Sequence, residues 1–213
     1  MTVQAVVFDL GGVLAEFSGV ATMRELARIS SDEELWARWL GCDWVRRFER
    51  GQCSPEDFAE GMVGEWRLPM TAPEFLAAFG EWVQAPYDGA EDLVTETAQR
   101  VPVAMLSNMN AVHWDRAVSA WSLVKRFDHV FTSFELGLIK PDAEVFHHVV
   151  DALGVEPEQV FFLDDNRINV EGARAAGLQA EQVRGVAEAR AAVSRKIGDG
   201  FHRNLRTPYA RAP

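Results

Sequence analysis

The residues best suited to do chemistry are acids that directly follow short apolar runs. Asp9 follows the run at 4–8, and Asp164 and Asp165 follow the run at 160–163. A carboxylate directly after a buried strand is costly unless it is hydrogen-bonded or binds a cation. Two adjacent carboxylates repel each other, and a hard divalent cation with oxygen ligands is the usual remedy. These acids therefore predict a divalent cation site.

Other polar groups follow apolar runs in the same way. Ser107 and Asn108 come after the run at 101–106 and offer a hydroxyl and a backbone N–H that suit an oxyanion. Lys140 stands just before an expected helix, and Gly11 and Gly12 allow a tight turn close to a ligand. Each feature alone is common in turns and helix caps. Their combination, in this order, favours one shared site.

The elements that must position these groups are strands alternating with helices. Four short, apolar runs are typical of buried parallel strands: 4–8, 101–106, 130–132 and 160–163. Helical patterns lie between or after them, at 111–120, 142–153 and 168–176, the last closed by Gly177. This alternation predicts the α/β class, a Rossmann-like doubly wound parallel sheet. Because ligands bind beyond the carboxyl ends of such strands, the polar groups should meet there.

Residues 16–87 have a different pattern, without a convincing strand. Helix-start signals stand at Ser54 and Thr71, each followed by a proline and by an acid three residues on. Five tryptophans predict a hydrophobic core of its own, and the alternative is that one or two of them line the pocket: Trp36, Trp39, Trp44, Trp66 and Trp82. We expect a catalytic core of 1–15 and 88–200, a helical cap of 16–87, and a basic, poorly ordered tail of 201–213.

The composition excludes several classes of protein. The 213 residues carry a net charge of −11, which disfavours nucleic acid as a partner. Cys42 and Cys53 lack metal-ligand spacing and predict reduced thiols in a cytoplasmic protein. A signal peptide or a membrane-spanning run is not expected.

The ordered motifs resemble those of the haloacid dehalogenase superfamily of hydrolases. Residues 8–14, 106–108, 140–141 and 162–169 look like its four motifs, and the expected helical cap is placed like that of the family. Within the superfamily, residues 48–58 are similar to the cap of the sugar-phosphatase-like branch, which includes the N-terminal phosphatase domain of soluble epoxide hydrolase. The resemblance implies the haloacid dehalogenase fold with a small inserted cap.

The resemblance also implies a function, a cofactor and roles for residues. The protein would be a Mg²⁺-dependent phosphatase of a small phosphorylated metabolite, with a sugar phosphate as one candidate, and would work through an aspartyl-phosphate. Asp9 would be the nucleophile, and Asp9, Asp165 and the Gly11 carbonyl would hold Mg²⁺. The remaining predicted site residues are Ser107, Asn108, Lys140 and Gly12 around the phosphate, and Asp164 and Asn169 orienting their neighbours. In the cap, Arg46, Arg47 and Arg50 could meet an anionic group of the substrate.

One departure from the family pattern leaves alternatives open. Gly11 occupies the position where most phosphatases of the superfamily have an aspartate that acts as general acid, and Glu16 could replace it. A metal-independent 2-haloacid dehalogenase also lacks that aspartate, but it would leave Asp164 and Asp165 unpaired. A phosphometabolite-binding protein with weakened catalysis is the other alternative. The substrate and the oligomeric state stay open.

Overall fold

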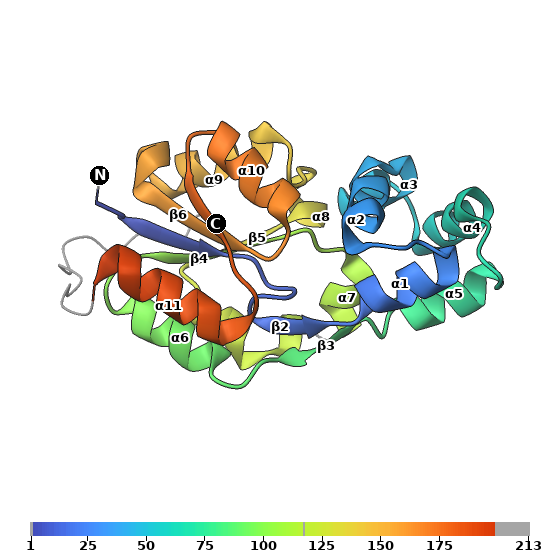
Figure 1. Ribbon diagram of the computed structural model, residues 1–213, viewed down its shortest axis with the longest axis horizontal. Coiled ribbons are helices and arrows are strands. Elements are labelled where there is room, and N and C mark those ends of the chain that lie inside the picture. Colours follow the sequence, from blue (N-terminus) through green and yellow to red (C-terminus); the bar gives the residue numbers. More distant parts are fainter. Residues whose placement is uncertain (1, 117, 199–213) are drawn as a thin grey trace.

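The computed structural model describes residues 2–116 and 118–198, and the tail predicted at 201–213 lies outside them (Figure 1). Its centre is a five-stranded parallel sheet in the order β5-β4-β1-β6-β7. The strands are β1 (Ala5–Phe8), β4 (Val103–Ser107), β5 (His129–Thr132), β6 (Val160–Asp164) and β7 (Gln179–Gln182). The α/β doubly wound fold is therefore confirmed. The sequence missed β7, an edge strand of mixed polarity that carries no apolar run.

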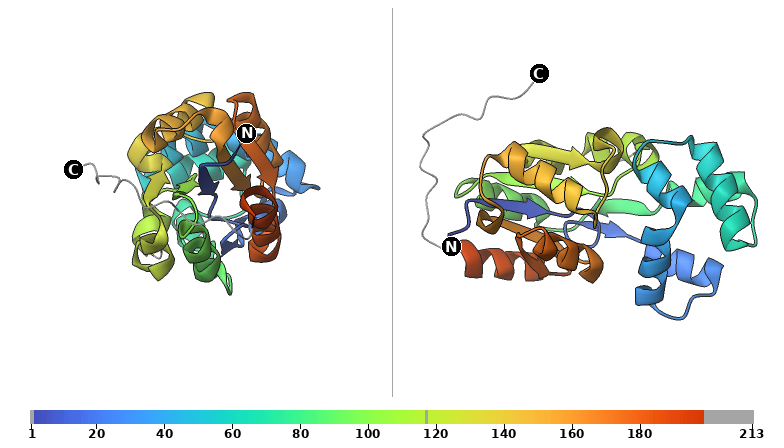
Figure 2. Two further views of the ribbon diagram at one scale, coloured as in Figure 1. Left: turned by 90° about the vertical axis from the view of Figure 1, so that its left-hand side faces the viewer. Right: turned by 90° about the horizontal axis from the view of Figure 1, so that it is seen from above.

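The two faces of the sheet are covered by different helices (Figures 1 and 2). Val6 and Phe8 of β1 pack in one cluster with α6 (Ala90–Ala98) and α11 (Gly185–Ile197). Ala5 and Val7 pack on the opposite face with α9 (Ala143–Leu153) and α10 (Arg167–Ala175). Successive side chains of a strand point to opposite faces, so a strand covered on both sides must be apolar throughout.

Short helical segments complete the connections. α7 (Ala111–Arg116) ends earlier than the predicted helix over 111–120, and a 3₁₀ turn follows at Val118–Ala120. The others are a second 3₁₀ helix at Ser122–Arg126, α8 (Ser133–Leu136) and a third 3₁₀ helix at Pro157–Gln159. None of the described helices combines the length and apolarity that a membrane crossing requires.

A group of five helices lies beyond the carboxyl ends of the parallel strands, and we call it the helical insertion (Figures 1 and 2). Its helices are α1 (Gly19–Ala27), α2 (Asp32–Gly41), α3 (Asp43–Glu49), α4 (Pro55–Trp66) and α5 (Ala72–Phe79). The predicted starts at Ser54 and Thr71 are confirmed, because each side chain accepts a hydrogen bond from a backbone N–H of the first turn. The helices share their own hydrophobic cluster, which includes Trp39, Trp66 and Trp82.

The prediction that residues 16–87 hold no strand was wrong. β2 (Ala15–Phe17) and β3 (Val83–Pro86) form an antiparallel pair. Both strands are short, β2 has an exposed glutamate in its centre and β3 ends in proline, so neither gives a strand pattern in the sequence. The pair carries the chain into and out of the helical insertion. The predicted boundary at 16 falls inside β2, and the boundary at 87 directly follows β3.

Candidate active site

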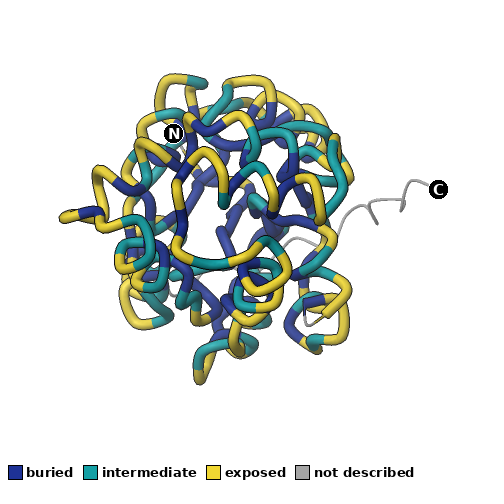
Figure 3. Tube along the Cα trace, turned by 90° about the vertical axis from the view of Figure 1, so that its right-hand side faces the viewer, coloured by how far each residue is buried: buried dark blue, intermediate teal, exposed yellow. Residues whose placement is uncertain are grey.

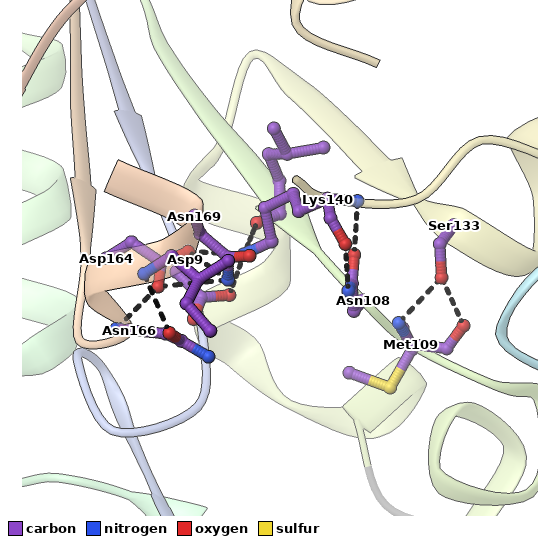
Figure 4. Close-up of polar contacts among 10 residues, drawn as sticks. Asp9, Asn108, Met109, Ser133, Lys140, Asp164, Asn166 and Asn169 are labelled. Carbon is purple, nitrogen blue, oxygen red and sulfur yellow. Dashed lines mark hydrogen bonds and ion pairs between the residues drawn. The ribbon is translucent and has the colours of Figure 1, made fainter. Parts of the chain in front are cut away.

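Lys140 lies between the carboxylates of Asp9 and Asp164 at the carboxyl ends of the inner strands β1 and β6 (Figure 4). Asp9 directly follows β1, and Asp164 ends the neighbouring β6. The Nζ atom of Lys140 is 2.8 Å from Oδ1 of Asp9 and 2.7 Å from Oδ2 of Asp164, and it donates to the Leu106 carbonyl oxygen at 3.1 Å. Burial acts to lower the pKa of Lys140, but the two carboxylates outweigh burial and raise it. Lys140 therefore stays charged although only 1% of it is exposed.

Asp164 is fully buried, and both of its oxygens are hydrogen-bonded. Oδ1 accepts from the backbone N–H of Asn166 at 2.8 Å, and Nδ2 of Asn169 lies 3.2 Å from Oδ1 and 3.1 Å from Oδ2. With Lys140 added, the carboxylate has a partner on every side (Figure 4). Asp164 thus orients Lys140, and Asn169 orients Asp164.

The Asp165 carboxylate differs, because no described residue forms a hydrogen bond or ion pair with it. Carboxylate oxygens of Asp9, Asp164 and Asp165 all lie within 4.8 Å of one another. Burial, reinforced by the other two acids, raises the pKa of Asp165 to about 8. Burial also raises the pKa of Asp9 to about 7, although Lys140 acts in the opposite direction.

The donors in this cluster fit a divalent cation. When all three carboxylates are ionised, their charge exceeds that of Lys140 by two negative charges, and Oδ1 of Asn169 is a further buried oxygen without a partner among the described residues. Hard oxygen donors of this kind suit Mg²⁺. Asp9 and Asp165 would hold it, with the Gly11 carbonyl nearby in the lining of the same pocket.

The two glycines after Asp9 contribute in different ways. Gly12 has a φ of +73°, and a Cβ atom there would lie 2.5 Å from Oδ2 of Asp165. Only glycine allows this close approach, and the N–H of Gly12 donates to the Ala15 carbonyl oxygen at 2.8 Å. Gly12 therefore shapes the loop instead of presenting a free N–H to a phosphate. Gly11 has room for a side chain, since Cβ of Phe17 would be 3.7 Å away.

Ser107 and Asn108 bring the end of β4 to the same pocket. Ser107 is buried and lines the pocket together with Asp9. The Asn108 side chain donates to the Lys140 carbonyl oxygen at 3.0 Å and accepts from the Lys140 N–H at 2.9 Å. This double hydrogen bond holds the Lys140 loop, a role that the sequence did not suggest.

The predicted arginines lie elsewhere, and none of the three lines the pocket. Arg46 and Arg50 donate to the same oxygen of Asp142, at 2.5 and 2.6 Å. The guanidinium of Arg47 lies over the Trp44 ring, 4.9 Å from its centre. The structure therefore does not bring them together with Asp9.

Sequence reasoning missed a chain of contacts between buried polar side chains on the side of the pocket that faces the helical insertion. Glu49 of α3 is 6% exposed, its Oε1 accepts from Asn110 at 3.3 Å, and its Oε2 has no partner among the described residues. The same Asn110 nitrogen is 3.1 Å from Nδ1 of His113, whose Nε2 donates to the Phe79 carbonyl oxygen at 2.7 Å. This chain of contacts joins the helical insertion to α7.

Burial shifts both titratable groups of that chain toward their neutral forms. It raises the pKa of Glu49 to about 7 and lowers the pKa of His113 to about 4. The position of Asn110 two residues after Asn108 was a usable signal in the sequence. Glu49 falls within the stretch 48–58 that resembles the cap of the sugar-phosphatase-like branch, but its position between arginines on a helix suggested no role for it.

Comparison with known proteins gives the same family as the motifs. A family model of haloacid dehalogenase-like hydrolases matches residues 3–177. A phosphatase from Mycobacterium tuberculosis is 30% identical, over 84% of this chain and 87% of that protein. A sesquiterpene phosphatase from Aspergillus oryzae is 28% identical over 83% and 88%. An (S)-2-haloacid dehalogenase from a Pseudomonas species is 26% identical over 82% and 80%.

Two further likenesses concern the branch and the fold. Rat bifunctional epoxide hydrolase 2 is 34% identical over 37% of this chain and 14% of its own length, a distant relationship to the predicted branch. A HAD family enzyme from Bacteroides thetaiotaomicron, solved in complex with magnesium and inorganic phosphate, has a TM-score of 0.66 at 22% identity, over 85% of this chain and 94% of that one. The sheet-edge acids with their lysine, the motif order and these matches agree, and the chain belongs to the haloacid dehalogenase-like hydrolases.

Proposed function

We propose that the protein is a Mg²⁺-dependent phosphatase that hydrolyses a small phosphorylated metabolite. The observation that carries the proposal is the cluster of three carboxylates, Asp9, Asp164 and Asp165, around the single cation of Lys140, which has two excess negative charges once all three acids are ionised. A divalent cation balances that excess, and a phosphoryl group can then approach the acids. Phosphatases among the relatives, and the magnesium and phosphate in the Bacteroides structure, support the same reaction.

In this proposal Asp9 forms the covalent bond to the substrate. A carboxylate oxygen of Asp9 attacks phosphorus, the bond from phosphorus to the organic oxygen breaks, and the alkoxide leaves and takes a proton from water. Water then hydrolyses the aspartyl-phosphate, which releases inorganic phosphate and restores Asp9. The Ser107 hydroxyl and the Asn108 N–H bind the phosphoryl oxygens, and Lys140 orients Asp9. Mg²⁺, when bound by Asp9, Asp165 and the Gly11 carbonyl, offsets the repulsion between carboxylate and phosphate.

A second candidate is a 2-haloacid dehalogenase, favoured by the dehalogenase relatives and by the glycine at position 11. The unpaired Asp165 carboxylate is evidence against it, because a metal-independent site leaves this half-buried third acid without a partner. The free thiols Cys42 and Cys53 support a reducing compartment such as the cytoplasm for either enzyme.

The test compares two reactions with and without the metal. The whole protein is assayed for phosphate release from para-nitrophenyl phosphate and a panel of phosphorylated metabolites, and for chloride release from 2-chloropropionate, each with Mg²⁺ or with EDTA. We expect phosphate release that EDTA abolishes, and no chloride. Chloride release that survives EDTA would establish the dehalogenase, and phosphate binding without turnover would establish a binding protein.

A thermal-shift measurement gives a readout that does not depend on the substrate. Mg²⁺ at a hundredfold excess over its Kd should stabilise the fold by about 2.7 kcal/mol. Asp165→Asn should remove most of that shift, whereas the matched exposed variant Asp88→Asn should keep it. A melting temperature that does not respond to Mg²⁺ would remove the main support for the metal.

A further inference from the structure

The pocket has a second end that the phosphatase reaction does not use. The cavity, about 120 Å³ in volume, runs from the acids of the sheet edge to the helical insertion. Its far end is lined by large apolar side chains: Phe17, Val20, Trp36, Trp39, Leu40 and Phe79. Five of these six belong to helices of the insertion, and Phe17 belongs to β2. Figure 3 views the molecule from the side of the insertion and shows buried and exposed segments of the chain next to each other there.

Several of these side chains are not fully covered by protein. Phe17, Val20 and Trp36 are half-buried, although they pack against the hydrophobic cluster of the insertion. A second, smaller cavity without polar lining shares Phe17, Val20, Trp36 and Trp39 with the first. The apolar lining therefore continues past the main pocket. Leaving such surface in contact with water costs about 25 cal/mol per Å², which an apolar guest would recover.

The charges around the far end disfavour a polar or anionic organic group. Lys140 is the only cationic side chain that lines the pocket among the described residues, and its charge is taken up by the acids. Both ring nitrogens of His113 are hydrogen-bonded, so they are not free to bind a polar group of the substrate. The other ionisable side chains on this side of the pocket are the carboxylates of Glu49 and Glu16, which would repel an anionic group. A sugar would bury hydroxyls for which the walls offer few partners, and each unpaired buried hydroxyl is costly.

We propose that this far end binds the organic group of the substrate, and that the group is a hydrocarbon ring or branched chain. The natural substrate is then a phosphate monoester of an apolar alcohol or phenol, and a sugar phosphate is a poor substrate. This inference rests on the proposed phosphatase function and names its substrate class. The raised pKa of Glu49 agrees with it, because a carboxyl with a pKa of about 7 is neutral in a large share of the molecules near neutral pH, unlike an ordinary glutamate.

The test uses substrates that differ in polarity but share a primary alkyl oxygen as leaving group. We compare kcat/KM for 2-cyclohexylethyl phosphate with kcat/KM for glucose 6-phosphate and glycerol 3-phosphate, with Mg²⁺ present. A single methylene group in an apolar pocket is worth about 10- to 200-fold, so we expect at least about a hundredfold preference for the cyclohexyl compound. An equal or higher value for glucose 6-phosphate would overturn the inference.

The same experiment separates this inference from the proposed function. If para-nitrophenyl phosphate is hydrolysed while the sugar phosphate is preferred among alkyl esters, the phosphatase function stands and the hydrocarbon site fails. If no monoester is hydrolysed, the phosphatase function fails and the inference fails with it.

Variants of the far end give an independent readout. Trp36→Ala should lower the ratio of the two kcat/KM values at least tenfold, mainly through the KM of the cyclohexyl compound. Trp44→Ala is the matched control, because Trp44 packs on the same cluster but does not line the pocket. Val20→Thr keeps the shape of the side chain, and it should lower the ratio even if Trp36→Ala fails to fold. An unchanged ratio in Val20→Thr and in any folded Trp36→Ala would overturn the inference.

Discussion

The pocket has two walls, one formed by the sheet and one by the helical insertion, and they differ in the number of charged side chains that they carry. On the sheet side, Asp9 and Asp164 stand at or directly after strand ends, and Lys140, from the loop between α8 and α9, joins them in a continuous set of ion pairs and hydrogen bonds. On the insertion side the wall is mostly aromatic, and its buried acid, Glu49, keeps one oxygen without a partner among the described residues. Reacting groups need fixed positions, which strand ends provide. An apolar wall sets no position but selects the group that fits.

The largest expected effect is on the charged wall. Asp9→Asn keeps the size of the side chain but removes the proposed nucleophile, because a neutral amide does not attack phosphorus. We expect turnover to fall by at least about 10⁴-fold, equivalent to roughly 5 kcal/mol at 1.36 kcal/mol per factor of ten. The measurement is phosphate release with Mg²⁺, with exposed Asp88→Asn as the matched control. Wild-type activity in Asp9→Asn would end the covalent mechanism.

A smaller effect, on stability, should follow from removing the cation that joins the acids. Lys140→Met keeps the length of the side chain and leaves Asp9 and Asp164 facing each other without a positive charge. Breaking a buried pair in this way typically costs about 3–5 kcal/mol. Urea denaturation in EDTA should show that loss, whereas exposed Lys125→Met should change little. A variant as stable as the wild type would mean that Lys140 does not balance the acids.

The same contrast explains what could be predicted from the sequence. The strands that carry Asp9, Ser107 and Asp164 were predictable, because a strand covered on both faces is a continuous apolar run. β2, β3 and β7 were missed, because they are short and partly polar and so give no such run. The motif residues therefore lie together at the carboxyl ends of adjacent parallel strands, as the strand order requires.

Contacts between the insertion and the core were not predictable in the same way. Arg50 and Asp142 are 92 residues apart, and Glu49 and Asn110 are 61 residues apart. Each pair depends on how the helical insertion packs on the core, and no local sequence pattern records that packing. The aromatic composition of residues 16–87 predicted a separate hydrophobic core and left pocket tryptophans as an alternative, and Trp36 and Trp39 line the pocket.

Glu49→Gln sharpens the comparison by making the apolar wall neutral. The pKa of Glu49 rises from 4.5 to about 7 on folding, because burial outweighs its contacts with Asn110 and the nearby charge of Lys140. Below pH 4.5 both the folded and the unfolded wild type are protonated at Glu49, so the variant gains nothing. Between pH 4.5 and 7 the unfolded state has lost this proton and the folded state keeps it, so the wild type loses stability as pH rises.

The stability difference should therefore grow across that window and level off near 3 kcal/mol in favour of Glu49→Gln. His113 acts with the opposite sign, because its pKa is lowered to about 4 and stability falls as pH drops below 6.5. Both proteins contain His113, so its contribution cancels in the difference. Denaturation from pH 4 to 8 measures the stability difference between the wild type and Glu49→Gln. For the exposed control Glu60→Gln, that difference should not change with pH. A difference independent of pH would show that Glu49 ionises normally in the folded protein.

The smallest expected effect concerns Gly11, at the boundary between the two walls. The wild type has no carboxyl at this position, so the barrier should rise with the pKa of the leaving alcohol, and aryl phosphates should react faster than primary alkyl phosphates of similar shape. Gly11→Asp fits, because the backbone there is not left-handed and the nearest atoms to a new Cβ are Phe17 Cβ at 3.7 Å and Cγ at 3.9 Å. The variant should raise kcat/KM for alkyl phosphates about tenfold relative to aryl phosphates, below the usual range for an evolved general acid.

Gly11→Asn has the same size without the proton, and it should leave the slope of kcat/KM against leaving-group pKa as steep as in the wild type. A flat slope in the wild type, with chemistry shown to be rate-limiting, would mean that another carboxyl donates the proton. Glu16 and Glu49 line the same pocket and would then be the first residues to substitute.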